Sequence, residues 1–196
     1  MGGLCACGGT VQTPTSPPTP VALPSPTPAP LTCGVERWPV KTLSDADALR
    51  VNFTPVSSSV AILSALPSHC GDGPDNARVY AEEVQVFEVV GRIIVARAED
   101  DRDFHVAIAD PNDGSTMVTE VADPGCSGAT ASPFGHQLQT ARASFDAFRG
   151  GRSLSALAGE LVRVRGVGFY DFNHGQTGRA RSCIELHPIL SIERAQ

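Results

Sequence analysis

Hydrophobic and polar residues alternate in two stretches near the C-terminus of the chain. Within residues 160–170 valines alternate with arginines, and within residues 183–189 isoleucine and leucine alternate with glutamate and histidine. A period of two residues is typical of β-strands that present one apolar face. The intervening residues 173–178 are polar and contain two glycines. We therefore predict two strands joined by a polar loop.

Three earlier stretches also have strand character. Residues 80–98 form a long run rich in valine and isoleucine. Gly91 lies in its middle, and a glycine inside a long strand often marks a bend. Residues 104–108 alternate between apolar and other side chains, and residues 116–121 follow a turn sequence, Asp-Pro-Asn-Asp-Gly, at 110–114. This pattern predicts three consecutive antiparallel strands.

One helix is predicted after the third strand. Ser132 can cap its start, and Pro133 fits its first turn. A Gly-Gly pair at 150–151 ends the segment. Between these limits an apolar stripe recurs at helical spacing, formed by Leu138, Ala141, Phe145 and Phe148.

Three strands, a helix and two strands follow the order of the OB-fold, a five-stranded Greek-key barrel. We expect a mainly β fold of this kind, with the helix between strands three and four, in residues 79–196. A lead-in lobe in residues 32–78, with a short extended segment and a short helix, precedes it. In OB-folds the loops after strands one and four and the face of strands two and three form the usual binding surface.

The first 31 residues differ in composition from the rest. They contain no charged residue, and half of the 16 prolines fall between Pro14 and Pro30. Such a segment cannot bury a core and is expected to be a disordered tether. Residues 4–9 resemble the lipobox of bacterial lipoproteins, with Cys7 as the acylated residue. No segment is long and apolar enough to cross a bilayer, so we expect membrane attachment through this lipid alone.

Charge and cysteine content restrict the partners and the compartment. A net charge of −6 argues against a general nucleic-acid binder.

Four cysteines of the domain, Cys33, Cys70, Cys126 and Cys183, lie far apart and without a Cys-x-x-Cys pair, which argues against a zinc ribbon. They indicate two disulfides in an oxidising compartment, with free buried thiols as the alternative. Three pairings are open, and one of them joins Cys33 to Cys70 within the lead-in lobe and Cys126 to Cys183 between neighbouring strands.

Three motifs carry a resemblance to a known group of proteins. They are Cys-Gly-x-Glu-Arg-Trp-x-Val-Lys-Thr at 33–42, Asp-x-His-x-x-x-x-Asp at 103–110, and His-Gly-Gln-Thr-Gly at 174–178 followed by Glu-Leu-His-Pro at 185–188. With these motifs the domain resembles a widespread family of uncharacterised secreted or lipid-anchored bacterial proteins. The resemblance implies a location in the bacterial cell envelope or outside the cell, and implies no reaction.

Histidines and carboxylates on the predicted strands form a candidate metal site. If the apolar residues of strands two and five face the core, then His105, Glu185 and His187 face outward, with Thr119 or Glu120 between them. Imidazole and carboxylate ligands suit Zn, Mn or Fe, and the same groups can position a water for general-base chemistry. In the alternative interpretation, His105 and His187 are only hydrogen-bonded surface or packing residues. The candidate ligands of a divalent metal cofactor are His105, His174, Glu185 and His187.

The polar loop and the strand before it form a candidate ligand site. Guanidiniums can hold a phosphate or carboxylate by bidentate bonds, and loop glycines let backbone N–H groups approach an anion. The aromatic residues of 169–172 can stack on bases or sugars. In the alternative interpretation, the arginines form a solvated strand face, the glycines only close a turn, and the aromatic residues pack in the core. The candidate binding residues are His174, Gln176, Thr177, Arg179, Arg163 and Arg165.

Two functions follow from these patterns. The first is an extracytoplasmic, lipid-anchored binding module that presents the 174–178 loop and the adjacent barrel face to a small anionic molecule, a saccharide or a polymer. The second is a metal-dependent hydrolase, for instance of phosphodiesters, that uses the histidines and Glu185. A structural spacer in an envelope assembly is a third interpretation. The sequence lacks the Gly-x-Ser-x-Gly, P-loop and dinucleotide motifs, which lowers the weight of common hydrolase and cofactor-dependent functions.

Overall fold

A computed structural model describes residues 1–4, 33–34 and 36–196. The predicted tether in residues 8–31 and the predicted lipidation site Cys7 lie outside these residues. In the part of the chain that the structure describes, no helix combines the length and the apolar character needed to cross a bilayer.

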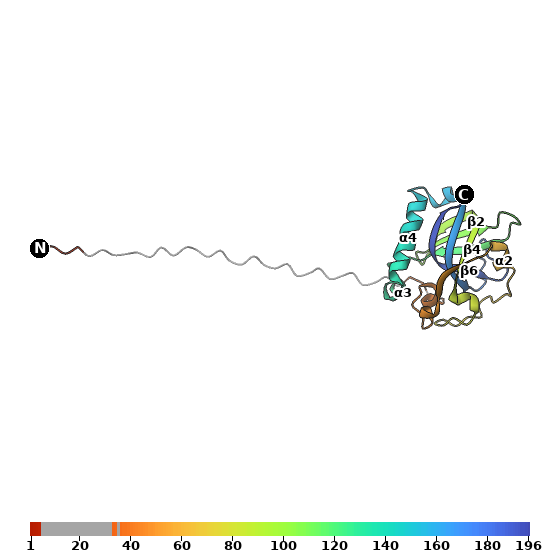
Figure 1. Ribbon diagram of the computed structural model, residues 1–196, viewed down its shortest axis with the longest axis horizontal. Helices are drawn as coiled ribbons and strands as arrows, with labels where there is room; N and C mark the ends of the chain where they lie inside the picture. The colour runs from red at the N-terminus through yellow and green to blue at the C-terminus, as the bar shows by residue number, and fades with distance from the viewer. Residues whose placement is uncertain (5–32, 35) are drawn as a thin grey trace.

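Five strands close into a barrel (Figure 1). They follow the order β2–β3–β4–β6–β5, and β5 pairs back onto β2. β4 and β6 pair in parallel, whereas the other four barrel pairings are antiparallel. This connectivity is that of a Greek-key OB barrel and confirms the predicted fold. The strands are β2 (Gln85–Ala98), β3 (Phe104–Ala109), β4 (Thr116–Val121), β5 (Leu161–Tyr170) and β6 (Ile184–Arg194).

The long strand β2 changes its partner close to Gly91. Its first half pairs with β5 as far as Arg92, and its second half pairs with β3 from Arg92 onward. A Cβ atom on Gly91 would lie 2.9 Å from the Cδ1 atom of Ile108, closer than such atoms approach in proteins. The glycine therefore lies where the sequence predicted a bend, and its missing side chain permits the close approach of β3.

The helix α4 (Gly135–Arg149) follows β4 in the chain, as predicted, and packs against β4 and β6. All four residues of the predicted apolar stripe are buried. The ring of Phe145 lies 5.1 Å from that of Phe104 on β3 and 6.3 Å from that of Phe148. Gly150 ends the helix in the left-handed conformation, with a φ of 58°. The helix therefore contributes its aromatic side chains to the barrel core.

The start of α4 differs from the prediction. The helix begins at Gly135 rather than at Ser132, and a separate short helix, α3 (Ser127–Ala131), precedes it. The hydroxyl of Ser132 donates to the carbonyl oxygen of Leu43 at 2.6 Å. The same hydroxyl accepts from the backbone N–H of Phe134 at 3.1 Å, so Ser132 holds the segment before α4 and also connects it to the lead-in lobe.

The lead-in lobe adds a sixth strand to the sheet. β1 (Asn52–Ser57) pairs with the first half of β2 in parallel. The expected short helix in this lobe is present as α2 (Val60–Ser64), on the opposite side of the barrel from α4 (Figure 1). The remaining short elements are α1 (Trp38–Lys41), η1 (Ala48–Arg50), η2 (Ala81–Val84) and η3 (Leu154–Leu157).

Buried arginines fasten the lead-in lobe internally and to the barrel. The side chain of Arg78 is fully buried; its Nη2 lies 2.9 Å from Asp45 Oδ2, and it also donates to the carbonyl oxygens of Val40 and Glu83, each at 2.7 Å. Arg37 donates to Glu83 Oε1 at 2.6 Å and to the carbonyl oxygen of Tyr170 at 2.8 Å. Each buried charge is thus paired and hydrogen-bonded, as burial of a charge requires.

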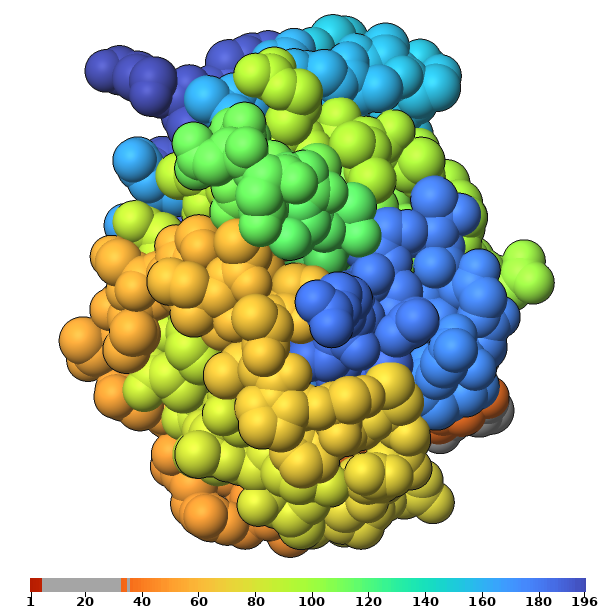
Figure 2. Space-filling model, turned by 90° about the vertical axis from the view of Figure 1, so that its right-hand side faces the viewer, coloured from red at the N-terminus to blue at the C-terminus, as the bar shows by residue number. Residues whose placement is uncertain are grey.

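Two disulfides join the lead-in lobe to the rest of the domain. Cys33 bonds to Cys126 and Cys70 bonds to Cys183, with Cα–Cα distances of 5.7 and 5.2 Å. The pairings considered from the sequence, Cys33–Cys70 and Cys126–Cys183, are therefore wrong. The physical reason is that the lobe folds over the barrel instead of closing on itself; its residues form one continuous surface with the 171–183 loop (Figure 2). Two disulfides are consistent with an extracytoplasmic location.

Candidate functional site

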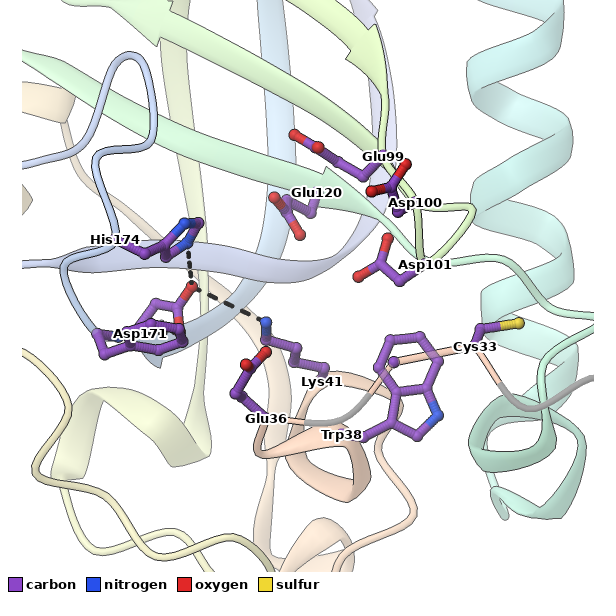
Figure 3. Close-up of a pocket in the computed structure, with 12 residues that line it drawn as sticks. Cys33, Glu36, Trp38, Lys41, Glu99, Asp100, Asp101, Glu120, Asp171 and His174 are labelled. Atoms are coloured by element: carbon purple, nitrogen blue, oxygen red, sulfur yellow. Dashed lines mark hydrogen bonds and ion pairs between the residues drawn. The ribbon is translucent and has the colours of Figure 1, made fainter.

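A pocket of about 500 Å³ opens between the lead-in lobe and the two barrel loops that OB-folds use for binding (Figure 3). The turn after β2 contributes three consecutive acidic residues, β4 contributes Glu120, and the loop after β5 contributes one wall. The segment around α1 forms the opposite wall. The lining residues are Cys33, Gly34, Glu36, Trp38, Lys41, Glu99, Asp100, Asp101, Glu120, Asp171, Phe172 and His174.

The pocket is strongly acidic. Six of its lining residues are Asp or Glu, and its basic residues are Lys41 and His174. Lys41 Nζ lies 3.8 Å from Asp171 Oδ2, which in turn lies 3.5 Å from His174 Nε2 (Figure 3). Burial alone would lower the pKa of Lys41, but the charge of Asp171, followed by those of Glu120 and Glu185, raises it. The two basic groups are therefore occupied by Asp171, and the pocket retains an excess of negative charge.

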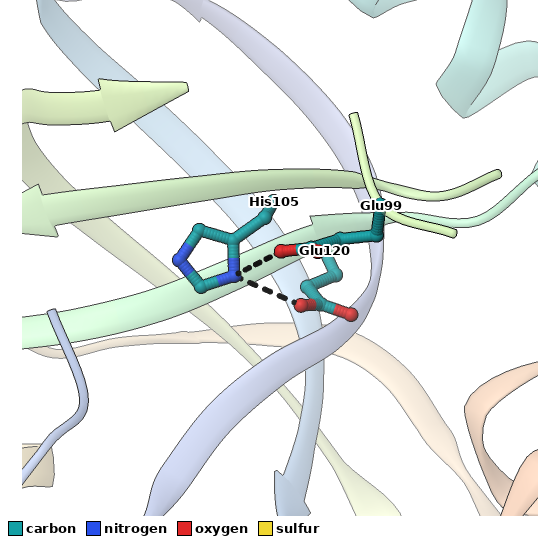
Figure 4. Close-up of side chains that lie close together, drawn as sticks. All are labelled: Glu99, His105 and Glu120. Carbon is teal, nitrogen blue, oxygen red and sulfur yellow. Dashed lines mark hydrogen bonds and ion pairs between the residues drawn. The ribbon is translucent and has the colours of Figure 1, made fainter. Parts of the chain in front are cut away.

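His105 holds the loop after β5 through a hydrogen bond to its backbone. Its Nε2 lies 2.9 Å from the carbonyl oxygen of Thr177, and because a carbonyl can only accept, this nitrogen carries the hydrogen. Its Nδ1 faces two carboxylates, with Glu120 Oε1 at 3.1 Å and Glu99 Oε1 at 3.5 Å (Figure 4). The side chain of His105 is only 1% exposed. An imidazole thus joins the loop to the acidic floor of the pocket.

His187 lies between two carboxylates in the interior. Its Nε2 is 3.2 Å from Asp103 Oδ2 and its Nδ1 is 3.1 Å from Glu120 Oε2. Burial would lower the pKa of His187, but the contacts with Asp103 and Glu120 outweigh it and raise the pKa to about 10. Conversely, burial would raise the pKa of Glu120, and the hydrogen bonds from His105 and His187 lower it. At neutral pH an imidazolium therefore balances this buried carboxylate.

The pKa of Glu185 is shifted in the opposite direction from that of Glu120. Glu185 is buried under the loop, and Gln176 Nε2 lies 3.4 Å from its Oε1. Burial, followed by repulsion from the charges of Glu120 and Asp171, raises the pKa of Glu185 well above its usual value. A carboxyl group whose pKa is raised releases its proton less readily, which weakens it as a metal ligand.

The loop residues proposed for ligand binding mostly hold the loop itself together. The side chain of Gln176 accepts from the backbone N–H of His174 at 3.1 Å and donates to the carbonyl oxygen of Phe172 at 3.0 Å. Thr177 contributes the carbonyl oxygen that binds His105. Among the predicted loop residues, His174 lines the pocket, with its side chain 47% exposed.

The proposed arginines do not line the pocket. Arg163 and Arg165 lie on the outward face of β5, where Glu88 pairs with them at 3.4 and 2.6 Å. Arg165 is five residues before the end of the strand, roughly 16 Å along its axis. The guanidinium of Arg179 donates to the carbonyl oxygen of Ala180 at 3.0 Å. Arg163 and Arg165 therefore form a solvated strand face paired with an acidic residue, which was the alternative to an anion-binding site.

The side chains of His105, Glu185 and His187 alternate with core residues, as predicted, but none of them is accessible, because all three are at most 1% exposed. The alternation is correct, but the lead-in lobe covers the face that it defines. Lys41 and Arg37 lie over the ring of Phe169, 5.5 and 4.9 Å from its centroid, and Phe169 contacts the ring of His187 at 5.6 Å. Of the two residues expected between the histidines, Thr119 or Glu120, it is Glu120 that contacts both rings.

The four proposed metal ligands do not form one group. Among the described residues, clusters that could hold a metal ion are Glu99 with His105 and Glu120, and Asp103 with Glu120 and His187. His174 and Glu185 belong to neither cluster. A usable signal for Glu99 was present in the sequence, because residues 99–101 are three successive acidic residues in the first binding loop of the predicted OB-fold.

The comparisons with known proteins are sparse. No family model matches this chain, and no curated protein matches it. A solved structure from Leishmania major Friedlin, described as an aspartyl-tRNA synthetase, aligns with a TM-score of 0.37 and 13% sequence identity. The alignment covers 74% of this chain and 21% of that one, so the chain spans about a fifth of its length. A likeness this weak supports no inference about function.

Proposed function

We propose that this protein is an extracytoplasmic OB-like binding module whose pocket takes a positively charged ligand. The observation that carries the proposal is the concentration of six acidic residues around one pocket, at the surface that OB barrels use for binding. The positive charge is supplied by an organic ammonium or guanidinium group, or by a divalent cation.

The chemistry of the pocket walls agrees with a ligand of modest size. Carboxylates form strong charge-assisted hydrogen bonds with ammonium and guanidinium groups. Trp38 and Phe172 also line the pocket, and aromatic faces attract cations. A pocket of about 500 Å³ lies in the range of small-molecule sites. An anionic ligand would meet repulsion from the same carboxylates, and the arginines proposed to hold it lie elsewhere.

Attachment to a membrane through a lipid on Cys7 remains part of the proposal. The two disulfides support a location outside the cytoplasm. Replacement Cys7→Ser is expected to move the protein from the membrane fraction to the soluble fraction of the producing cell, with no change in ligand binding.

A metal-dependent hydrolase in the form proposed from the sequence has less support. Its four residues are divided among different environments: His187 and Glu185 are sealed in the interior, whereas His174 faces the pocket. The arrangement therefore favours a binding pocket over the four-residue catalytic site.

Calorimetric titration of the purified full chain with spermidine and with citrate tests the proposal. We expect spermidine to bind, with an affinity that falls as salt is added, and citrate not to bind. The exposed pocket residues Glu36 and Asp100 permit the substitutions Glu36→Gln and Asp100→Asn, which should weaken spermidine binding several-fold. Asp75→Asn, at an exposed position outside the pocket, is the matched control. Binding of citrate, or equal spermidine affinity in all variants, would contradict the proposed function.

A further inference from the structure

We propose that Glu99, His105 and Glu120 hold a divalent metal ion of the Zn²⁺ or Mn²⁺ type at the floor of the pocket (Figure 4). This inference rests on the proposed function, since it identifies one positively charged occupant of the same pocket. One ligand atom from each side chain lies within 4.8 Å of the other two. This set shares only His105 with the ligands expected from the sequence.

The spacing of the ligand atoms fits one metal ion. In a tetrahedral site with bonds of about 2.1 Å, neighbouring ligand atoms lie about 3.4 Å apart. His105 Nδ1 lies 3.1 Å from the Oε1 atom of Glu120 and 3.5 Å from that of Glu99. An imidazole nitrogen with two carboxylate oxygens is a ligand set that suits Zn, Mn or Fe. The three side chains therefore need little rearrangement to surround an ion.

The hydrogen bonding of His105 directs its Nδ1 atom at this position. Its Nε2 donates to the carbonyl oxygen of Thr177, so Nδ1 is the nitrogen that faces the two carboxylates. A metal ion would take the place of any hydrogen that Nδ1 shares with them. A histidine whose second nitrogen donates to a backbone carbonyl is a common arrangement for metal ligands, because the bond fixes the tautomer and the ring orientation.

The carboxylates are oriented as well. His187 lies 3.1 Å from the second oxygen of Glu120, Oε2, which leaves Oε1 directed at His105. Arg97 Nε donates to Glu99 Oε1 at 2.8 Å, and this contact fixes the position of that carboxylate. Each of the three ligands is thus held by a further residue, an arrangement that typically supports metal affinity.

The cluster of Glu99, His105 and Glu120 is open to solvent through the pocket, whereas the cluster of Asp103, Glu120 and His187 is not. Glu99 and Glu120 line the pocket, so the remaining coordination positions of the ion would face solvent or ligand. The other cluster needs Asp103 and His187, whose side chains are 0% exposed and do not line the pocket. The open cluster is therefore the better metal site.

Metal titration of the purified full chain, after removal of bound ions with a chelator, tests the assignment. We expect one equivalent of Zn²⁺ or Mn²⁺ per chain, and Co²⁺ in the same site should give a visible spectrum with nitrogen and oxygen ligation. Glu99→Gln and His105→Ala should each lower the affinity about tenfold or more. Glu99 lies in a turn and is partly exposed, so its variant keeps the test valid if His105→Ala does not fold.

His174→Ala is the matched control, because it removes an imidazole that lines the pocket but lies outside the cluster. It should leave the metal stoichiometry and the Co²⁺ spectrum unchanged. Absence of stoichiometric metal in the wild type, or wild-type affinity in Glu99→Gln, would overturn the assignment. Loss of metal only in Asp103→Asn would place the ion in the sealed cluster and equally overturn it. Spermidine binding by the metal-free protein is measured separately. If the protein binds metal but not spermidine, only the organic-cation part of the proposed function is contradicted. If it binds spermidine but not metal, only this metal site is contradicted.

Discussion

Replacement of Arg78 tests whether buried ion pairs hold the lead-in lobe in place. Its side chain and that of Asp45 are both 0% exposed, and their closest atoms are 2.9 Å apart. Arg78→Met leaves the carboxylate of Asp45 buried without its partner, which typically costs about 3–5 kcal/mol. In a domain of this size each kcal/mol lowers the melting temperature by roughly 2–4 °C. We therefore expect a fall in melting temperature of roughly 6–20 °C.

A double-mutant cycle separates the ion pair from the other contacts of Arg78. Asp45→Leu alone leaves the guanidinium unpaired, whereas the double variant removes both charges. Because the carbonyl oxygens of Val40 and Glu83 still lose the hydrogen bonds from Arg78, we expect the double variant to recover only part of the stability. The expected coupling between the two positions is about 2–3 kcal/mol.

The assay is urea denaturation of the oxidised full chain. Trp38 is the only tryptophan of the chain and is buried in the lead-in lobe, so its fluorescence reports on the lobe, while circular dichroism reports on the barrel. The control is Arg50→Met, which removes the exposed ion pair between Arg50 and Asp47 and should have no measurable effect. If Arg78→Met is as mild as this control, or if the coupling is below about 0.5 kcal/mol, the reasoning is refuted.

Three further predictions concern the fold. Peptide mapping of the unreduced protein should recover Cys70 linked to Cys183. Cys70→Ser removes this disulfide, which spans a sequence separation of 113 residues, and in the chain-entropy model the loss costs about 4–5 kcal/mol and lowers the denaturation midpoint. Phe145→Ala should cost about 3–5 kcal/mol because the ring is fully buried, whereas the exposed Gln139→Ala on the same helix should be neutral, and equal midpoints would contradict this packing. Burial opposes ionisation of Asp110, but backbone N–H groups, first that of Asn112, outweigh it and lower the pKa below the usual 3.8. Its stabilisation is therefore present above that value and is lost as pH falls through the lowered pKa, so acid titration should show less loss of stability in Asp110→Asn, and an identical acid profile would exclude this role.

The barrel could be predicted because local pattern determines it. Alternation identified β3, β5 and β6, a run rich in valine and isoleucine identified β2, and the turn at 110–114 identified β4. The helical spacing that ends at Gly150 identified α4. Closure followed from the element order alone, since β2 must pair with two partners in this topology. Gly91, at the change of partner, was visible as an isolated glycine in an apolar run.

The site could be predicted only in part. Alternation placed His105 and His187 on one face with Thr119 or Glu120 between them, and the structure has Glu120 there. It could not show that this face is covered, because Arg37 and Arg78 act through single long-range ion pairs that leave no periodic signal. The same coverage decides the disulfide pairing, since cysteine spacing contains no information about which segment folds over which.

The two disulfides overlap along the chain, because Cys70 lies between Cys33 and Cys126, and Cys126 lies between Cys70 and Cys183. A protease that cleaves one peptide bond anywhere from Cys33 to Cys183 therefore leaves both halves covalently connected. Outside the cytoplasm, where peptidases are abundant, a nicked molecule would keep its barrel, its pocket and its attachment to the N-terminal segment as a single species until a second cut or a reductant separates them.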